Sequence, residues 1–368
     1  MVTDYFVYVG TFTAAPTPPE PPRPSSSKGI YVFRFHSAKA VLTPLGLAAA
    51  TFSPSFFAIH PNHRFLYAVV NRKNGDVRSF AIHPQNGKLS VLNEAASHGD
   101  NPCFIDTDRV GKNVLVANYT SGSVAVLPIQ PDGRLGEASA VVEDKGHSIN
   151  PERQQGPHAH MISTSPDNRF AVISDLGLDK LLVFRFNADK GTLAANKPPF
   201  VRVKAGSGPR HFCFLPSGTF AYVISEMAST VTAFAYDAKS GAFKEVQTIS
   251  TLPNGFKKEN TGAEIEMHPS GKFLYASNRG LDSIAVFAID PGRGTLRLVD
   301  QVSTQGRGPR AFELDPTGSF LFAANQISQN LVTFRINPRT GRLTLIGQVD
   351  VPVPACVKFV PAGQRRGL

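Results

Sequence analysis

The stretch Met267–Val299, MHPSGKFLYASNRGLDSIAVFAIDPGRGTLRLV, carries the pattern that decides the fold. It opens with a proline-led turn, HPSG, and a run of alternating aromatic and aliphatic residues follows. A second run, SIAVFAI, comes next, and the glycine-containing turn GRGT separates it from a last short one. Short runs of β-branched and aromatic residues bounded by Gly and Pro are typical of β-strands. The stretch therefore predicts consecutive antiparallel strands joined by turns.

The same pattern recurs along the chain at intervals of about 45 to 55 residues, which indicates a repeat architecture. Four short strands in a repeat of this length are typical of a propeller blade. Six units fit between Ser53 and Asp350, and the terminal runs YFVYVGTF, GIYVFRF and VPACVKFV complete a seventh. A blade shared by both chain ends closes the ring and removes the free strand edge. The repeated turns are marked by Pro61, Pro166, Pro216, Pro269 and Pro316, with a degenerate copy at Asp108–Lys112.

We therefore predict an all-β chain that forms one seven-bladed β-propeller domain over residues 1–368. The composition agrees, because 42% of the residues are hydrophobic while 31 Gly and 29 Pro supply many turns. Two insertions interrupt the repeat: a proline-rich surface loop at 14–27, and a polar loop at 144–157 that leads into the motif GPHAH. Cys103, Cys213 and Cys356 form no CxxC pair, so neither a disulfide framework nor a zinc site is indicated.

The formal net charge of +10 points to an anionic partner. The Lys and Arg residues are scattered, no run of five occurs and Trp is absent, whereas nucleic-acid-binding surfaces cluster their basic residues. We expect a small anionic ligand and no nucleic acid. No segment approaches the roughly 18 consecutive apolar residues of a membrane span. We expect no membrane partner, a monomer and a cytoplasmic location; the sequence leaves open whether an export signal has been removed.

Aligning the blades selects one face of the ring, because the start of each innermost strand and the end of the next strand meet at the same end of an antiparallel pair. The start positions are Ser55, Cys103, His160, Arg210, Ala263, Arg310 and Ala355, and the end positions are Asn71, Tyr119, Asp175, Leu176, Glu226, Arg279 and Gln326. Several charged and polar side chains therefore converge at one predicted mouth of the tunnel. His158 keeps the strand parity of His160 and is expected to assist, whereas His211 is expected on the opposite side of its strand, as a packing residue.

At this point the chain resembles the lactonase-type seven-bladed propellers, a family that includes the propeller form of 6-phosphogluconolactonase and the fungal 3-carboxy-cis,cis-muconate lactonising enzyme. The resemblance rests on YVGTFT (Tyr8–Thr13), NPERQQGPHAH, SGPRH, ISE, SNRG and GPRAFELDPTGSFL. It implies a catalytic set of His160, Glu226, Arg210 and Arg279. It also implies hydrolysis of a sugar lactone, as in the 6-phosphogluconolactonases, with neither metal nor cofactor.

This chemistry suits the residue types. A base must take the proton of the attacking water, and we expect Glu226 or His160 in this role, with the other as acid to the ring oxygen. Arg210 and Arg279 are expected to stabilise the carbonyl oxygen or hold a substrate anion. The substrate-binding set is expected to include His158, Asp175, Arg310, Gln326 and Arg153. Two alternatives stay open: cycloisomerisation of a carboxylated muconate at the same site, and a scaffold without catalysis, since a propeller does not imply one function.

Overall fold

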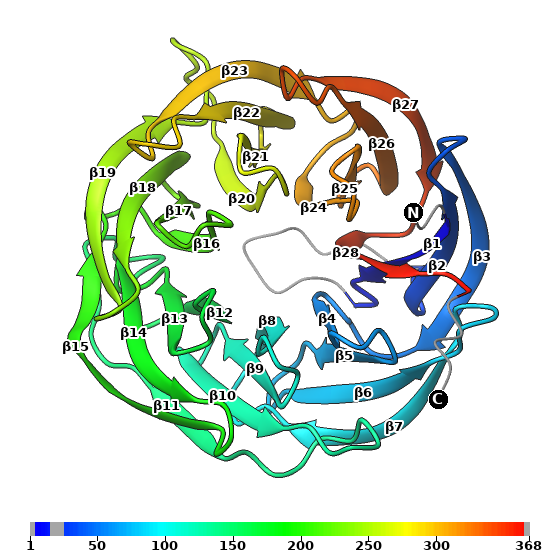
Figure 1. Ribbon diagram of the computed structural model, residues 1–368, viewed down its shortest axis with the longest axis horizontal. Coiled ribbons are helices and arrows are strands. Elements are labelled where there is room, and N and C mark those ends of the chain that lie inside the picture. Colours follow the sequence, from blue (N-terminus) through cyan, green and yellow to red (C-terminus); the bar gives the residue numbers. More distant parts are fainter. Residues whose placement is uncertain (1–3, 15–25, 364–368) are drawn as a thin grey trace.

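The computed structural model describes residues 4–14 and 26–363 of the chain. Within these residues the chain forms 28 strands and no helix, and the strands make seven four-stranded antiparallel sheets arranged as a ring (Figure 1). The prediction of a seven-bladed all-β propeller is therefore confirmed. The proline-rich insertion lies mostly outside the described residues, which resume at Ser26.

The blades are given from the innermost strand outwards. They comprise β28 (Pro354–Pro361), β1 (Asp4–Thr11), β2 (Gly29–His36) and β3 (Val41–Ala50); β4 (Phe57–Ile59), β5 (Phe65–Val70), β6 (Asp76–Ile82) and β7 (Leu89–Ala96); β8 (Pro102–Thr107), β9 (Asn113–Asn118), β10 (Ser123–Pro128) and β11 (Ala140–Glu143); β12 (Ala159–Thr164), β13 (Phe170–Asp175), β14 (Lys180–Asn187) and β15 (Thr192–Arg202); β16 (Pro209–Phe214), β17 (Phe220–Ser225), β18 (Thr230–Asp237) and β19 (Ala242–Ser250); β20 (Thr261–Met267), β21 (Phe273–Arg279), β22 (Ser283–Ile289) and β23 (Leu296–Ser303); and β24 (Pro309–Leu314), β25 (Phe320–Asn325), β26 (Asn330–Ile336) and β27 (Leu343–Asp350).

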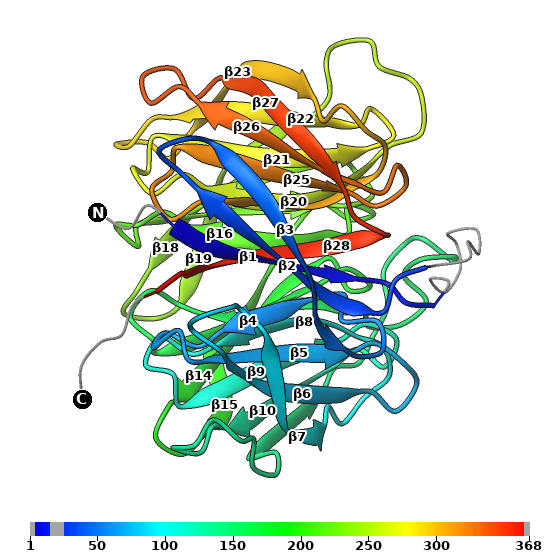
Figure 2. The ribbon, with the colours of Figure 1, turned by 90° about the vertical axis from the view of Figure 1, so that its right-hand side faces the viewer.

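The two chain ends share one blade, as predicted. Strand β28 pairs antiparallel with β1 in a register that runs from Tyr5 opposite Pro361 to Thr11 opposite Pro354. Figure 2 shows the two strands side by side in the edge-on view, between β4 of the next blade and the sheets of the preceding ones. This pairing closes the ring, because the chain's first and last strands satisfy each other's backbone groups and leave no open sheet edge between blades.

Hydrophobic side chains hold neighbouring blades face to face. The second strands are buried along their whole length in several blades, for example β5, β9 and β25, whereas the outermost strands alternate between exposed and half-buried positions. Gly341 lies in an outer turn with a φ of +73°, and a Cβ atom there would approach the Phe273 ring to 2.6 Å. The turn can therefore dock on the preceding blade only with glycine. The Tyr275 hydroxyl, which would otherwise be buried without a partner, donates to the Gly341 carbonyl (2.9 Å).

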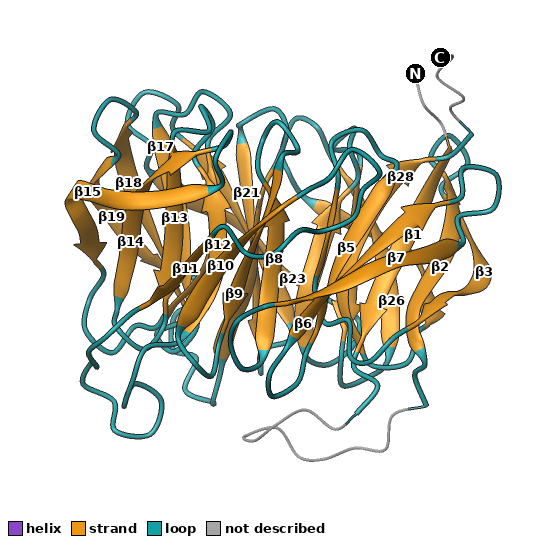
Figure 3. Cartoon of the chain, turned by 90° about the horizontal axis from the view of Figure 1, so that it is seen from below, coloured by secondary structure: helices purple, strands orange, loops and turns teal. Residues whose placement is uncertain are grey.

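The innermost strands define two faces of the ring. We call the face where they begin the strand-start face, and the face where they end the strand-end face; Figure 3 shows the connecting loops gathered on these two faces. The pairing register shifts where most innermost strands begin. In five innermost strands the shift leaves one residue without a partner on the second strand, at the positions of Cys103, His160, Arg210, Arg310 and Ala355. Such β-bulges re-aim side chains and are common beside functional sites.

The loop at 144–157 crosses the strand-start face and is tied down by hydrogen bonds. The Ser148 hydroxyl donates to Asp179 (2.6 Å), and the Gln154 amide donates to the carbonyl of Leu176 (2.8 Å). Gln154 is fully buried. Since both ends of the loop are anchored to the blade of β12–β15, the loop holds Arg153 over the tunnel mouth.

All three cysteines are free thiols. Among the described residues, no helix is long or apolar enough to cross a membrane. The same residues contain no group of three or more His, Cys, Asp or Glu side chains arranged to hold a metal ion.

Candidate functional site

Glu226 is the centre of the predicted site. It directly follows β17 and is almost fully buried, with 6% of its surface exposed. Arg153 Nη2 donates to its Oε1 (2.7 Å), while Arg210 Nε and Arg279 Nη2 reach its Oε2 at 3.0 and 3.1 Å. The three guanidiniums come from the loop at 144–157, from β16 and from the end of β21. One carboxylate thus gathers three of the predicted cations on the strand-start face.

The arginines differ in their access to solvent. Arg210 is 2% exposed, and its Nη1 also donates to the carbonyl of Ala263 (2.6 Å), so its side chain is fixed between two blades. The side chains of Arg279 and Arg153 are 15% and 28% exposed. These two guanidiniums therefore form the accessible side of the cluster, whereas Arg210 forms its buried base.

The arginines determine the protonation state of Glu226. Burial alone raises the pKa of this carboxyl, but the charges of Arg279, Arg210 and Arg153 outweigh burial and lower the pKa to about 2. Burial and the nearby Arg279 and Arg310 also lower the pKa of Arg210, to about 10, which still leaves it charged at neutral pH. Glu226 is therefore an ionised anchor for the arginines, and it is neither an acid nor a strong base near pH 7.

His160 lies at the bulge of β12 and is buried. Its ring contacts those of Tyr119 and His211, with centroids 5.5 and 5.0 Å away. Burial, together with the positive charge of Arg210, holds the pKa of His160 well below its usual range. The imidazole is therefore unprotonated at neutral pH. Its Nδ1 is buried without a hydrogen-bond partner.

His158 and Asp175 support the mouth through the backbone. The His158 ring stacks on Tyr119 (4.7 Å between centroids, 15° between planes), and its Nδ1 lies 2.9 Å from the Tyr119 carbonyl. Asp175 is fully buried and accepts hydrogen bonds from the backbone N–H groups of His158 (2.9 Å) and Leu178 (3.0 Å). Burial raises the pKa of Asp175 to about 7, although the His158 N–H opposes the shift. The structure therefore places Asp175 under the loop that carries His158, away from the arginine cluster.

Arg310 and Gln326 occupy the strand-start face of the last blade before the closure. Arg310 lies at the bulge of β24, with its guanidinium 5.1 Å from the centre of the Phe12 ring. Its charge contributes to the lowered pKa of both His160 and Arg210. Gln326 follows β25 and is buried, and its backbone N–H donates to the carbonyl of Gly308 (2.9 Å). Arg310 thus belongs electrostatically to the cluster around Glu226.

Tyr119 is a member of this site that the predicted set omitted. Its hydroxyl accepts from Arg153 Nη2 (3.2 Å), and its ring contacts both His158 and His160. The repeat alignment already placed Tyr119 at the end of a second strand, in the position equivalent to Glu226. That equivalence was the signal for including it.

The expected position of His211 was wrong. Its ring lies within 5.1 and 5.8 Å of the Phe104 and Phe56 rings, which come from blades across the tunnel. The reason is the bulge at Arg210, which interrupts the alternation of side chains along β16. Both Arg210 and His211 therefore face the tunnel. The rings of Phe56, Phe104 and His211 form a layer across it, which we call the ring layer.

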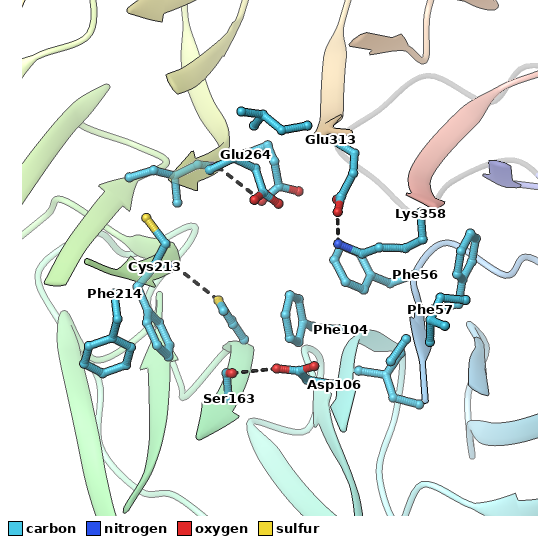
Figure 4. A pocket seen from close by; sticks show the side chains of 18 of the residues that line it. Phe56, Phe57, Phe104, Asp106, Ser163, Cys213, Phe214, Glu264, Glu313 and Lys358 are labelled. Carbon is cyan, nitrogen blue, oxygen red and sulfur yellow. Dashed lines mark hydrogen bonds and ion pairs between the residues drawn. The ribbon is translucent and has the colours of Figure 1, made fainter. Parts of the chain in front are cut away.

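A cavity of about 620 Å³ lies beyond the ring layer, towards the strand-end face (Figure 4). Pro166, Pro216 and Pro316, which follow the ends of innermost strands, are among the residues that line it. Its charged lining residues are Asp106, Arg109, Glu264, Glu266, Glu313 and Lys358. Lys358 Nζ donates to Glu313 (2.6 Å), and the Ser163 hydroxyl donates to Asp106 (2.6 Å). His160, Arg210, Glu226 and Arg279 do not line this cavity. The cavity and the arginine cluster therefore lie at opposite ends of the tunnel.

Fold and site together define a β-propeller with a strongly cationic polar site at one end of its tunnel. The model of the family "Lactonase, 7-bladed beta-propeller" matches residues 6–359. The chain thus belongs to the seven-bladed propeller lactonase family.

Relatives with curated names and solved structures agree. The chain is 37% identical over 312 residues to a 6-phosphogluconolactonase of Bacillus subtilis, covering 84% of this chain and 85% of the relative. It is 33% identical over 314 residues to a 6-phosphogluconolactonase of Formosa agariphila, with 83% and 85% covered. The structure of a periplasmic gluconolactonase of Pseudomonas aeruginosa is similar with a TM-score of 0.89 and 32% identity, covering 98% of this chain and 100% of that one. The chain is thus a 6-phosphogluconolactonase-like member of the family.

Proposed function

We propose that this protein hydrolyses an anionic sugar lactone, with 6-phosphogluconolactone as the first candidate, at the strand-start face of the tunnel. One observation carries the proposal: a buried, neutral imidazole, His160, lies beside Arg210 and Arg310, and Arg210 joins Arg153 and Arg279 around the carboxylate of Glu226. Arg153, Arg210, Arg279 and Arg310 against Glu226 and the nearby ionised Glu264 leave a formal charge of +2. A phosphorylated substrate would neutralise much of this charge.

His160 is the proposed general base. Water attacks the lactone carbonyl carbon while His160 Nε2 takes its proton, and a negative charge develops on the carbonyl oxygen. The guanidinium of Arg279, held by Glu226 and partly open to solvent, stabilises this charge. The tetrahedral intermediate then collapses, the bond between the carbonyl carbon and the ring oxygen breaks, and His160 returns the proton to the leaving oxygen. The products are a hydroxyl group and a carboxylic acid, which releases its proton to solvent and becomes a carboxylate, so one water is consumed.

The roles of the remaining residues follow from their exposure. Arg153 and Arg310 are proposed to hold the substrate phosphate, because both lie at the cationic mouth and Arg153 is the more exposed partner of Glu226. Tyr119 and His158 shape the wall next to His160. Glu226 positions the arginines and takes no proton. This assignment replaces the sequence-based hypothesis that Glu226 and His160 share the acid and base roles.

The experiment compares the wild type with His160→Gln on freshly prepared 6-phosphogluconolactone and on unphosphorylated gluconolactone, with the spontaneous rate subtracted. His83→Gln is the matched control, because His83 is an exposed histidine in the outer turn after β6. We expect activity with the phosphorylated lactone, its loss in His160→Gln and its retention in His83→Gln. Equal activity of the two variants would overturn the assignment of His160. Turnover of 3-carboxy-cis,cis-muconate instead of either lactone would favour the cycloisomerase alternative.

The cellular location and the oligomeric state stay predictions. We propose a monomer in the cytoplasm with a small anionic lactone as its partner. The Pseudomonas aeruginosa relative is named periplasmic, so cell fractionation is an informative test. Light scattering of the purified protein tests the monomer.

A further inference from the structure

Beneath the proposed catalytic imidazole lies a second buried pair that the proposed mechanism does not use. His211 Nδ1 and Glu264 Oε1 are 2.6 Å apart, and both side chains are buried. They come from β16 and β20, the innermost strands of adjacent blades. A buried ion-pairable contact of this kind costs desolvation energy, so a purely structural role would be equally well served by packed apolar side chains. Its place directly next to His160 suggests a different role.

The hydrogen-bond chemistry fixes which ring nitrogen of His211 carries the proton. Burial opposes ionisation of Glu264, but His211, Arg210 and Lys358 outweigh it and hold the pKa of Glu264 below its usual value. Burial lowers the pKa of His211 to about 4, although Glu264 opposes the shift. A neutral imidazole beside an ionised carboxylate must donate Nδ1–H, because the carboxylate only accepts. The Nε2 of His211 is then left as a lone-pair acceptor, buried and without a partner.

His160 carries a ring nitrogen, Nδ1, that could donate to the Nε2 acceptor of His211. Its ring lies 5.0 Å from that of His211, centroid to centroid, with 68° between the planes. Its Nδ1 is likewise buried without a partner. Two neighbouring rings thus each carry one unsatisfied nitrogen in a region with no exposure, where such groups are rare and demand an explanation. Catalytic hydrogen bonds are often long in a protein without substrate and tighten in the complex.

We propose that His211 and Glu264 are positioning residues for His160, in which Glu264 accepts from His211 Nδ1–H and His211 Nε2 accepts, directly or through one water, from His160 Nδ1–H. The inference rests on the proposed function. The arrangement keeps the proton of His160 on Nδ1, so its Nε2 lone pair is available to the attacking water. When His160 becomes positively charged during attack, the chain of hydrogen bonds links it to the negative charge of Glu264. The proton on His211 Nδ1 stays in the hydrogen bond between His211 and Glu264 throughout.

The hydrogen-bonded chain from His160 to Glu264 would stabilise the protonated state of His160. The positive charges of Arg210 and Arg310 disfavour a protonated His160, although the reaction requires that state to form transiently. Glu226 is fully occupied by three guanidiniums and gives little compensation. Glu264 is the ionised carboxylate that reaches the imidazole from the other side, through His211. Partners that orient a ligating or catalytic histidine in this way typically change activity by about ten- to a hundredfold.

The test uses Glu264→Gln in the full chain, with Glu313→Gln as the matched control. Glu313 lines the same cavity as Glu264, but it pairs with Lys358 and not with a histidine. We expect kcat of Glu264→Gln to fall by about ten- to a hundredfold with little change in KM, while Glu313→Gln keeps kcat within about threefold. Equal losses in the two variants, or a loss only in KM, would overturn the proposal. Thermal unfolding of both variants separates a loss of function from a loss of fold.

A second readout does not need activity. Two-bond ¹H–¹⁵N spectra of protein labelled at histidine report the tautomer of each ring, and His160→Gln and His211→Gln assign the signals. We expect both rings protonated at Nδ1 in the wild type, and a mixture of tautomers for His160 in Glu264→Gln. A wild-type His160 protonated at Nε2 would refute the coupling. If the wild type hydrolyses no lactone, the proposed function fails while this spectrum still decides the coupling.

Discussion

Glu226→Gln tests the claim that one ionised carboxylate organises the cationic mouth. The substitution keeps the size of the side chain, but it removes the charge that faces Arg153, Arg210 and Arg279. It also turns one acceptor oxygen into an N–H₂ group pointing at guanidinium donors. We expect a folded protein that is considerably less stable than the wild type and has lost most of its affinity for substrate.

The expected loss in the free energy of unfolding of Glu226→Gln can be worked out in two ways. Removing one partner of a buried ion pair typically costs about 3 to 5 kcal/mol, and only Arg210 is fully buried with Glu226. The partly exposed Arg279 and Arg153 add at most about 1 kcal/mol each. Separately, a folded pKa of about 2 for a carboxyl of ordinary pKa 4.5 corresponds to about 3 kcal/mol at neutral pH. The first consideration gives about 3 to 7 kcal/mol and the second lies at the lower end of that range, so we expect a loss of about 3 to 5 kcal/mol in the free energy of unfolding.

The contribution of Glu226 to the stability of the fold depends on pH. Because the folded pKa of Glu226 lies below the unfolded one, its contribution to stability is present above about pH 4.5 and is lost as the pH falls towards 2. The variant lacks this titration. The stability difference between wild type and Glu226→Gln should therefore be largest at neutral pH and shrink below pH 4.5.

The assay is urea unfolding followed by fluorescence and circular dichroism at pH 7, 5, 4 and 3. Glu94→Gln is the matched control, because Glu94 also faces two arginines, Arg72 and Arg78, but on the exposed outer strand β7. We expect a loss of about 0 to 1 kcal/mol for this surface pair. Equal stability of Glu226→Gln and wild type at pH 7, or a difference that does not change with pH, would refute the ionised anchor.

Three further predictions concern the mouth. Arg153→Met should raise KM for the phosphorylated lactone about tenfold, equal to about 1.4 kcal/mol, and leave KM for the unphosphorylated lactone nearly unchanged. The control is Arg169→Met, which replaces an exposed arginine on the strand-end face and should change neither KM. An equal effect on both lactones would contradict phosphate binding by Arg153. Asp175→Asn should keep KM within about threefold, since Asp175 bonds only to backbone among its described contacts, and a large rise in KM would restore it as a substrate ligand. The profile of kcat/KM against pH should stay flat from about 6.5 to 8 and fall only at lower pH, because burial and Arg210 depress the pKa of His160; an inflection above 6.5 would show a different base.

Periodicity in the sequence was sufficient for the fold. Each blade repeats one turn and one strand pattern, so the alignment of its copies indicated the blade number, the shared blade and the strand-start face together. His160, Arg210, Glu226 and Arg279 could be selected because a propeller places equivalent positions of successive blades around one axis. The structure gathers the last three in one cluster and places His160 beside its buried base.

Bulges, loop paths and side-chain partners could not be predicted from the sequence pattern. The alternation rule placed His211 on the far side of its strand, but the bulge at Arg210 turns both residues towards the tunnel. The path of the loop at 144–157 depends on anchors such as Gln154, whose long-range bond to the Leu176 carbonyl has no sequence pattern. The role of Glu226 depends on which arginines reach it, and therefore on distances. The acid and base roles were open for this reason.

The central claim is that the lactone is bound at the arginine cluster and not in the cavity at the strand-end face. The most direct measurement is a crystal structure of the wild type with the product, 6-phosphogluconate. The account predicts the phosphate on Arg153 and Arg310, and the carboxylate within hydrogen-bond distance of His160 and Arg279. Product bound beyond the ring layer, against Glu313 and Lys358, would contradict it.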